Sequence, residues 1–283
     1  MLAALVAPIA VAPASGASGP EATASAVSAS KFKKLKKQVA DQQRQIDALR
    51  AQVGQPGPQG PAGAQGAQGA QGSASACAGN GSGDVMVAAG SVCIDRYEAS
   101  IWDAPTGGNQ ITGAIPCNDN GQNCTNIYAR SVAGVVPSSR ITYFQAQAAL
   151  ANVGKRLPSN AEWQQAVAGT PDSTACNVSP GSVASTGANA LCVSNFGAND
   201  MVGNLDEWVG DWVPKANACS NWPAAFGTDF TCMGSSAAPT SNFPGALFRG
   251  GVFGGNAGAG PFAVHGGLEP SNLGVGIGFR GAR

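Results

Sequence analysis

The stretch GKRLPSNAEWQQAVAG, residues 154–169, decides how the surrounding chain folds. Ser159 stands three residues before Glu162, and this S-x-x-E spacing ahead of an apolar run is the capping box that starts a helix. We therefore expect a helix that begins after Ser159, buries Trp163 and ends at Gly169, because glycine readily adopts the left-handed conformation that closes helices.

A second helix is predicted just upstream of this stretch. Thr142 can cap a helix that continues to about Val153, where Gly154 stops it. Between the two helices, Arg156 can pair with Glu162 and so fasten the strand-like residues before the second helix to the helix itself.

The rest of the sequence from residue 77 onward favours short strands and irregular loops. The stretch VMVAAGSVCIDRYEA, residues 85–99, contains β-like pieces, and Gly, Pro and Asn turns are frequent elsewhere. The large apolar side chains of Trp163, Trp208 and Trp212 are expected in the core. Residues 77–283 are therefore predicted to form one α+β domain with few helices.

Read together, four phrases of this domain resemble the formylglycine-generating enzyme, or sulfatase-modifying factor, domain family. The phrases are CIDRYEAS (93–100), GKRLPSNAEWQQAVAG (154–169), GANDMVGNLDEWVGDW (197–212) and FRGG (248–251) followed by GFR (278–280). Their order and spacing also match, and the resemblance covers roughly residues 80–283. It implies a variant of the C-type lectin fold, which agrees with the loop-rich α+β prediction.

The resemblance also implies a calcium site in the phrase GNLDEW. Asn204 and Glu207 offer the oxygen ligands that Ca²⁺ requires, and Asn177 resembles a second calcium-binding position. The alternative is that Asn204 and Glu207 only hydrogen-bond a turn.

Oxidase members of this family bind copper through two cysteines that follow the Arg-Gly-Gly phrase. Here Arg249-Gly250-Gly251 matches that phrase, but the last cysteine of the chain is Cys232. Thiolate is the soft ligand that Cu(I) needs, so we expect no copper and assign no catalytic residue. The single histidine, His265, has no orienting acid nearby in the sequence, which argues against a Ser-His-Asp site.

The eight cysteines form no C-x-x-C pair, and an even, spread set is typical of disulfides in an oxidising compartment. Pairing of neighbours closes the shortest loops, although about 105 pairings of eight cysteines are possible. The neighbouring pairs are Cys77–Cys93, Cys117–Cys124, Cys176–Cys192 and Cys219–Cys232.

A stalk is predicted ahead of the domain. Residues 31–53 carry apolar residues in a heptad pattern typical of a coiled coil. The positions are Phe32, Val39, Ile46 and Val53, with Leu35, Gln42 and Leu49 between them. Residues 54–72 place glycine at every third position, as a collagen triple helix requires. Together they predict a homotrimer; the alternatives are a single amphipathic helix and a flexible linker.

The N-terminal residues 1–30 are predicted to be signal-like and disordered. Their apolar run is too short and too interrupted by proline for a membrane span. The basic run KFKKLKK, residues 31–37, is interpreted as a solvated helix face, so no nucleic-acid partner is expected.

The final stretch, AGPFAVHGGLEPSNLGVGIGFRGAR, resembles the variable region of proteins that retroelements diversify on this fold. The predicted ligand-binding residues are Phe253, Gly254, Gly255, Asn256, His265, Gly267, Leu268, Glu269, Asn272 and Gly274. The Ile277–Arg280 stretch would belong to the constant frame. The alternative is an undiversified domain in which the glycines only form turns.

These observations favour a secreted or surface-displayed trimer whose C-type-lectin-like heads bind an extracellular protein or glycan. Three heads on one stalk gain avidity from weak individual sites. The alternative function is an oxidoreductase of the same family with an altered active site.

Overall fold

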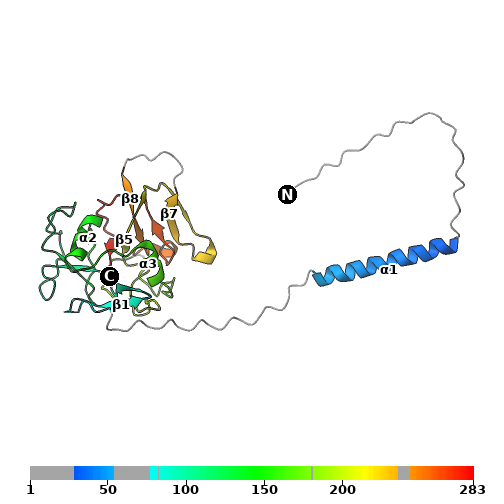
Figure 1. Cartoon of the computed structure of the whole chain (residues 1–283), viewed down its shortest axis with the longest axis horizontal. Helices are drawn as coiled ribbons and strands as arrows, with labels where there is room; N and C mark the ends of the chain where they lie inside the picture. Colours follow the sequence, from blue (N-terminus) through cyan, green and yellow to red (C-terminus); the bar gives the residue numbers. More distant parts are fainter. Residues whose placement is uncertain (1–28, 54–76, 82, 180, 235–242) are drawn as a thin grey trace, which may run out of the picture. The chain divides into compact units, whose positions relative to one another are not determined.

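The structure is a computed structural model that describes residues 29–53, 77–81, 83–179, 181–234 and 243–283. The predicted collagen-like repeat, and the signal-like region up to residue 28, lie outside the described residues. The chain divides into two units, and the boundary falls after Gly66. Helix α1 belongs to the first unit and the head domain to the second (Figure 1).

Helix α1 spans Ala29–Val53 and confirms that the heptad region is helical. The apolar heptad side chains are 44–62% exposed. Those described are Phe32, Leu35, Val39, Ile46 and Leu49. They form an apolar stripe along α1, the kind of seam that packs against another helix. Within the described residues, no helix combines the length and apolar character that a membrane crossing requires.

The head is built around a six-stranded sheet with the order β10-β5-β8-β9-β7-β6. Figure 1 labels β5, β7 and β8 of this sheet. Its strands are β5 (Asp206–Pro214), β6 (Ala218–Asn221), β7 (Phe230–Gly234), β8 (Pro244–Arg249), β9 (Val264–His265) and β10 (Ile277–Phe279). Strand β10 is parallel to β5 and β9 is parallel to β7, while the other neighbours are antiparallel. The sheet therefore combines distant parts of the chain, and its last strand pairs directly with the GNLDEW stretch.

The remaining strands of the head form two small antiparallel sheets. The first pairs β1 (Met86–Ala89) with β2 (Val92–Asp95), and the second pairs β3 (Ser100–Trp102) with β4 (Tyr128–Arg130). The tight turn between β1 and β2 uses Gly90 at a φ of 64°. The VMVAAGSVCIDRYEA stretch thus forms the predicted β structure.

The two predicted head helices are confirmed. Helix α2 spans Tyr143–Ala151 and begins at the Thr142 cap, with Gln145 completing a capping box. Helix α3 spans Asn160–Ala166 and has the predicted Ser159–Glu162 capping box. Arg156 and Glu162 form the predicted ion pair, with Nη1 and Oε2 2.6 Å apart. Local sequence signals therefore determine where both helices start.

Two apolar clusters form the core of the head, one around Trp163 and one around Trp208. Both indoles are completely buried. The prediction for Trp212 is wrong, because its side chain is 48% exposed. The pairing of β5 with β8 shifts register between Trp208 and Trp212. Both indoles pack edge-on against the Tyr143 ring, but only Trp208 is fully covered.

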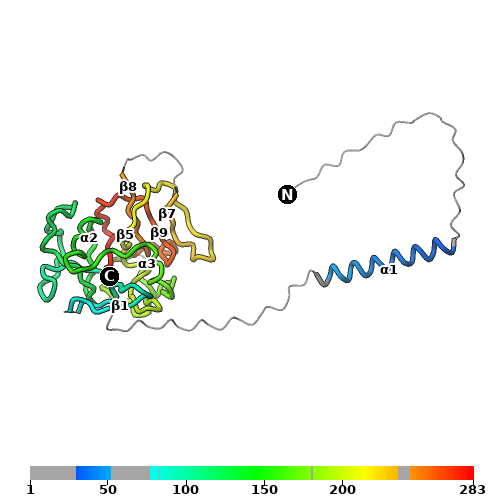
Figure 2. The backbone as a smooth tube through the Cα atoms, in the orientation of Figure 1, coloured from blue at the N-terminus to red at the C-terminus, as the bar shows by residue number. Residues whose placement is uncertain are grey.

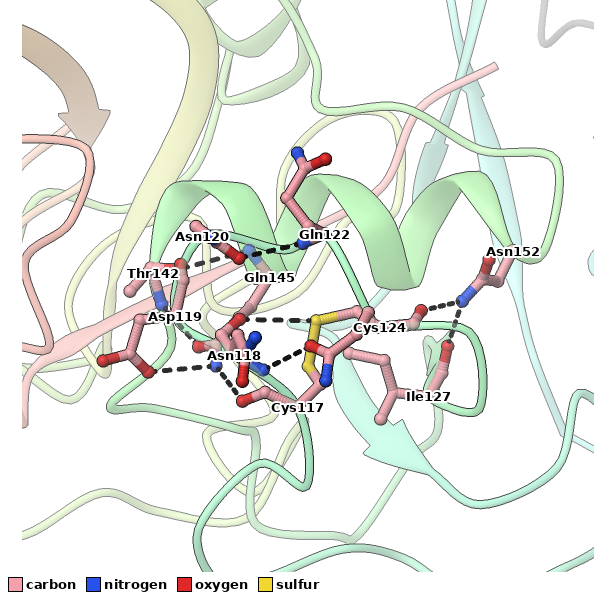
Figure 3. Close-up of a disulfide and its surroundings, with 11 residues drawn as sticks. Cys117, Asn118, Asp119, Asn120, Gln122, Cys124, Ile127, Thr142, Gln145 and Asn152 are labelled. Atoms are coloured by element: carbon pink, nitrogen blue, oxygen red, sulfur yellow. Dashed lines mark hydrogen bonds between the residues drawn. A yellow bond between two sulfur atoms is a disulfide. The ribbon is translucent and has the colours of Figure 1, made fainter.

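The four predicted disulfides are confirmed, and no described cysteine is free. Figure 3 shows the Cys117–Cys124 loop held against α2. Thr142 Oγ1 donates to the Asp119 carbonyl at 2.6 Å, and Asn152 Nδ2 donates to the Cys124 carbonyl at 2.7 Å. Both ends of the helix thus hold a loop that has no regular structure of its own.

Candidate functional site

The candidate ligand-binding residues lie on residues 250–276, which we call the C-terminal segment. It leaves the sheet at the end of β8, passes through β9 and returns at β10 (Figure 2). All ten predicted ligand-binding residues are exposed or half-buried. The segment therefore presents side chains to solvent while both of its ends are paired in the main sheet.

The first part of the C-terminal segment is held by its backbone. Phe253 N–H donates to the Asn204 carbonyl, and Gly254 N–H donates to the Ser179 carbonyl, both at 3.0 Å. A Cβ on Gly251 would come within 2.4 Å of Ala259 Cα, so only glycine fits the close approach that turns the chain here. The first four predicted residues thus form one short loop beside residue 179.

The second part is held at different places. Leu268 accepts a hydrogen bond from Ala246 N–H at 3.1 Å, and Gly274 accepts one from Arg140 N–H at 3.2 Å. Glu269 forms an ion pair with Lys215. The predicted residues therefore fall into two groups, 253–256 and 265–274, which contact different neighbours.

His265 lies in β9 and is half-buried. Its ring stacks between Phe230 and Phe248, with centroid distances of 5.5 and 4.5 Å. Burial lowers the pKa of His265, so the imidazole is neutral at pH 7. Its Nδ1 accepts from Gly267 N–H at 3.1 Å, and this bond fixes the start of the second group.

The Ile277–Arg280 stretch, which we call the buried frame, is completely inside the head. The Arg280 guanidinium forms two hydrogen bonds with the Glu207 carboxylate, one of them from Nε to Oε2 at 2.6 Å. It also donates to the carbonyls of Asp95 at 3.0 Å and Asn199 at 2.9 Å. The frame therefore fixes the far end of the C-terminal segment through charge as well as packing.

Two further buried acids surround this arginine, and sequence patterns did not identify them. Burial raises the pKa of Glu98 well above its usual range, and the nearby Asp200 and Glu207 raise it further. Burial also raises the pKa of Asp200 to about 6. The positive charge of Arg280 opposes both increases in pKa. Arg280 is therefore the cation that stabilises the ionised forms of these buried acids.

The residues predicted to bind calcium are close together but already paired. Asn177 Nδ2 donates to Asn204 Oδ1 at 2.9 Å, and Asn204 Nδ2 donates to Glu98. Both Glu207 oxygens accept from Arg280, and Oε2 also accepts from Trp163 Nε1 at 2.7 Å. The side-chain oxygens of Asn204 and Glu207 thus already accept N–H donors, and calcium binding at these residues stays a prediction.

A groove of about 580 Å³ adjoins the C-terminal segment. Residues 110–115 and 136–140 line it, together with Asp119, Gln145 and Leu273. Figure 3 shows Gln145 projecting from α2 toward Asp119; its Nε2 donates to Asp119 Oδ1 at 3.3 Å. The groove is in the size range of small-ligand sites, and no sequence motif pointed to it, because its walls come from separate loops.

Within the described residues, no cluster of three or more His, Cys, Asp or Glu side chains could hold a metal ion. The site is therefore an exposed segment beside a groove, supported by a buried charged frame. The architecture is that of an α+β domain that displays a loop-rich segment between two paired strands.

The family model of the sulfatase-modifying factor enzyme 1-like domain matches residues 26–283, and the chain belongs to this family. No curated protein sequence matches the chain.

Several solved structures have a similar fold. The Major Tropism Determinant P3c variant is 20% identical over 71% of this chain and 52% of its own, with a TM-score of 0.44. Treponema denticola variable protein 1 is 20% identical over 45% of this chain and 47% of its own, with a TM-score of 0.28. PvdO from Pseudomonas aeruginosa is 18% identical over 68% of this chain and 80% of its own, with a TM-score of 0.35. The chain thus spans about half the length of the tropism determinant, and the likeness concerns the fold alone.

Proposed function

We propose that the protein is an extracellular binding protein whose C-terminal segment contacts a protein or glycan ligand. The observation that carries this proposal is the division of burial along residues 250–280. The ten predicted ligand-binding residues reach solvent, whereas the buried frame does not. Substitutions at surface loop positions usually cost little stability, so the segment can present different side chains on one scaffold.

The four disulfides support export, since such bonds persist in oxidising compartments. They also argue against family-type copper chemistry. Cu(I) binding needs thiolates, and all eight cysteines of the chain are paired. Stoichiometric, tight Cu(I) binding by the purified protein would favour the alternative, an oxidoreductase with an altered active site.

Trimerisation through α1 is part of the proposal. Its exposed apolar stripe and the glycine repeat of residues 54–72 support three parallel chains. Three linked heads raise the effective concentration of each site, so weak contacts on each segment add up to firm attachment.

The test is sequencing of codons 240–283 in a population of the source organism. We expect substitutions to concentrate at the predicted ligand-binding positions, while Phe279 and Arg280 stay constant. A C-terminal segment as invariant as GNLDEW would overturn the diversified surface and favour a fixed ligand.

A further inference from the structure

The groove beside the C-terminal segment is built mainly by two loops that lie outside that segment. Residues 110–115 and 136–140 form its walls, and Leu273 is the contribution of the C-terminal segment. One wall is fastened to the segment, because Arg140 N–H donates to the Gly274 carbonyl at 3.2 Å. The groove therefore adjoins the second group of predicted ligand-binding residues.

Arg140 supplies this groove with a positive charge that the fold itself does not use. Its side chain is exposed, and no hydrogen bond, ion pair or ring contact joins its guanidinium to another residue of the described chain. Its backbone has a φ of 53°, which is uncommon outside glycine and persists where the surrounding structure fixes it. A planar guanidinium without a partner is suited to pair with a carboxylate of a ligand.

The apolar part of the groove consists of aliphatic side chains. Val136 and Leu273 are 51% and 43% exposed, and Ile111 and Ile115 are half-buried. None of the described residues that line the groove is aromatic. A sugar ring packs its apolar face best on a flat aromatic ring, whereas aliphatic side chains of a peptide pack well on aliphatic walls. The composition of the walls therefore favours a peptide over a glycan.

One wall also offers backbone hydrogen-bonding groups that are not in use. The N–H and C=O groups of residues 112–114 have no hydrogen-bond partner among the described residues, and these three residues are exposed. An extended peptide can pair its main chain with such a stretch, as peptides do when they add to the edge of a sheet. This wall thus provides the kind of contact that a peptide backbone requires.

A negative charge lies elsewhere in the same groove. Asp119 lies beside Thr142 at the start of α2, and its Oδ1 accepts from Gln145 Nε2 at 3.3 Å (Figure 3). Within the described chain, no ion pair joins Asp119 to Arg140. The two charges therefore give the groove a direction, since a ligand carboxylate is attracted to Arg140 and repelled by Asp119.

We propose that this groove binds an extended peptide segment of a partner protein, with an acidic side chain on Arg140 and aliphatic side chains on Val136 and Leu273. The inference rests on the proposed function and deepens it, because it names the ligand as a protein and specifies the chemistry of one of its segments. Most of the groove lies outside the C-terminal segment. The groove can therefore hold one class of peptide while the exposed residues of that segment select among partners.

The test is selection of short, phage-displayed random peptides on the purified full chain, followed by fluorescence-polarisation titration of the enriched peptides. We expect these peptides to share an Asp or Glu next to Val, Ile or Leu. Arg140→Met should weaken their binding at least about tenfold, because a charge-assisted hydrogen bond is lost. Arg140→Glu should enrich basic peptides instead, and Val136→Asp should also weaken the acidic ones. The matched control is Arg44→Met on α1, a 74% exposed arginine whose loss should leave the affinity unchanged.

The outcomes separate the groove from the C-terminal segment. The groove inference would be overturned if no peptide is enriched, if the enriched peptides lack an acidic residue, or if Arg140→Met binds them as tightly as the wild type. Peptides that lose affinity for Asn256→Arg but not for Arg140→Met would place the ligand on the C-terminal segment alone. In that case the proposed function would stand and the groove inference would fail. Acidic oligosaccharides that bind only when Arg140 is present, without any enriched peptide, would make the groove a glycan site and refute the peptide ligand.

Discussion

Replacing Arg280 with methionine should destabilise the head severely. The substitution leaves the fully buried Glu207 without its two guanidinium hydrogen bonds and removes the donors to two backbone carbonyls. Removing one partner of a buried ion pair costs about 3–5 kcal/mol. The upper part of this range applies, because Arg280 also offsets the charges of Glu98 and Asp200.

The assay is urea unfolding followed by tryptophan fluorescence, since Trp163 and Trp208 are both buried near this pair. The matched control is Arg140→Met, an exposed arginine whose loss should change the unfolding free energy by no more than about 0.5 kcal/mol. Adding Glu207→Gln to Arg280→Met should restore part of the loss, because no unpaired charge remains at Glu207. A loss below about 1 kcal/mol for Arg280→Met, or no recovery in the double variant, would refute the assigned role of the pair.

Three further outcomes are expected. Glu162→Gln keeps the capping box but loses the Arg156 ion pair, and should cost about 0.5–1 kcal/mol at pH 7 because the pair is half-exposed. Arg156 lowers the pKa of Glu162 to about 2. The contribution of the ion pair to stability is therefore complete above pH 4.5 and should be lost as the pH falls from 4.5 to 2. Chemical unfolding at a series of pH values should show the unfolding free energies of the wild type and Glu162→Gln converging in this range, and a constant difference would contradict the prediction. Ile46→Asp in the α1 stripe should convert a trimer to monomers in sedimentation equilibrium, and an unchanged mass would exclude this seam. Replacing Cys176 and Cys192 with serine should lower the unfolding free energy by about 3 kcal/mol, because the disulfide closes a loop of 16 residues. A decrease in melting temperature smaller than that of Glu162→Gln would contradict this prediction.

Sequence patterns predicted the local parts of the fold. The capping residues Thr142 and Ser159 form short-range hydrogen bonds, so their helices follow from spacing alone. The disulfide pairing was predicted from loop length for a similar reason. The exposed heptad stripe of α1 follows directly from the seven-residue repeat.

Features that depend on distant contacts could not be predicted. Trp212 is 48% exposed although it lies in a strand of the main sheet, and its own neighbours in sequence do not encode this. The Asn204–Glu98 bond joins residues 106 positions apart. Oxygen-rich motifs indicate where cations can bind, but the partners that occupy those oxygens appear only in the folded chain.

The first disulfide of the head has a mechanical consequence. Cys93 exchanges two backbone hydrogen bonds with Arg283, from N–H to O at 3.2 and 2.8 Å, and Cys77 is bonded covalently to Cys93. Tension that enters the head at Cys77 therefore passes through the disulfide to strand β2, and from there through the two backbone hydrogen bonds to Arg283. Strand β1 lies within the loop that the Cys77–Cys93 disulfide closes, so it carries none of that tension. A head pulled by a captured ligand would thus resist being peeled open from its N-terminal side.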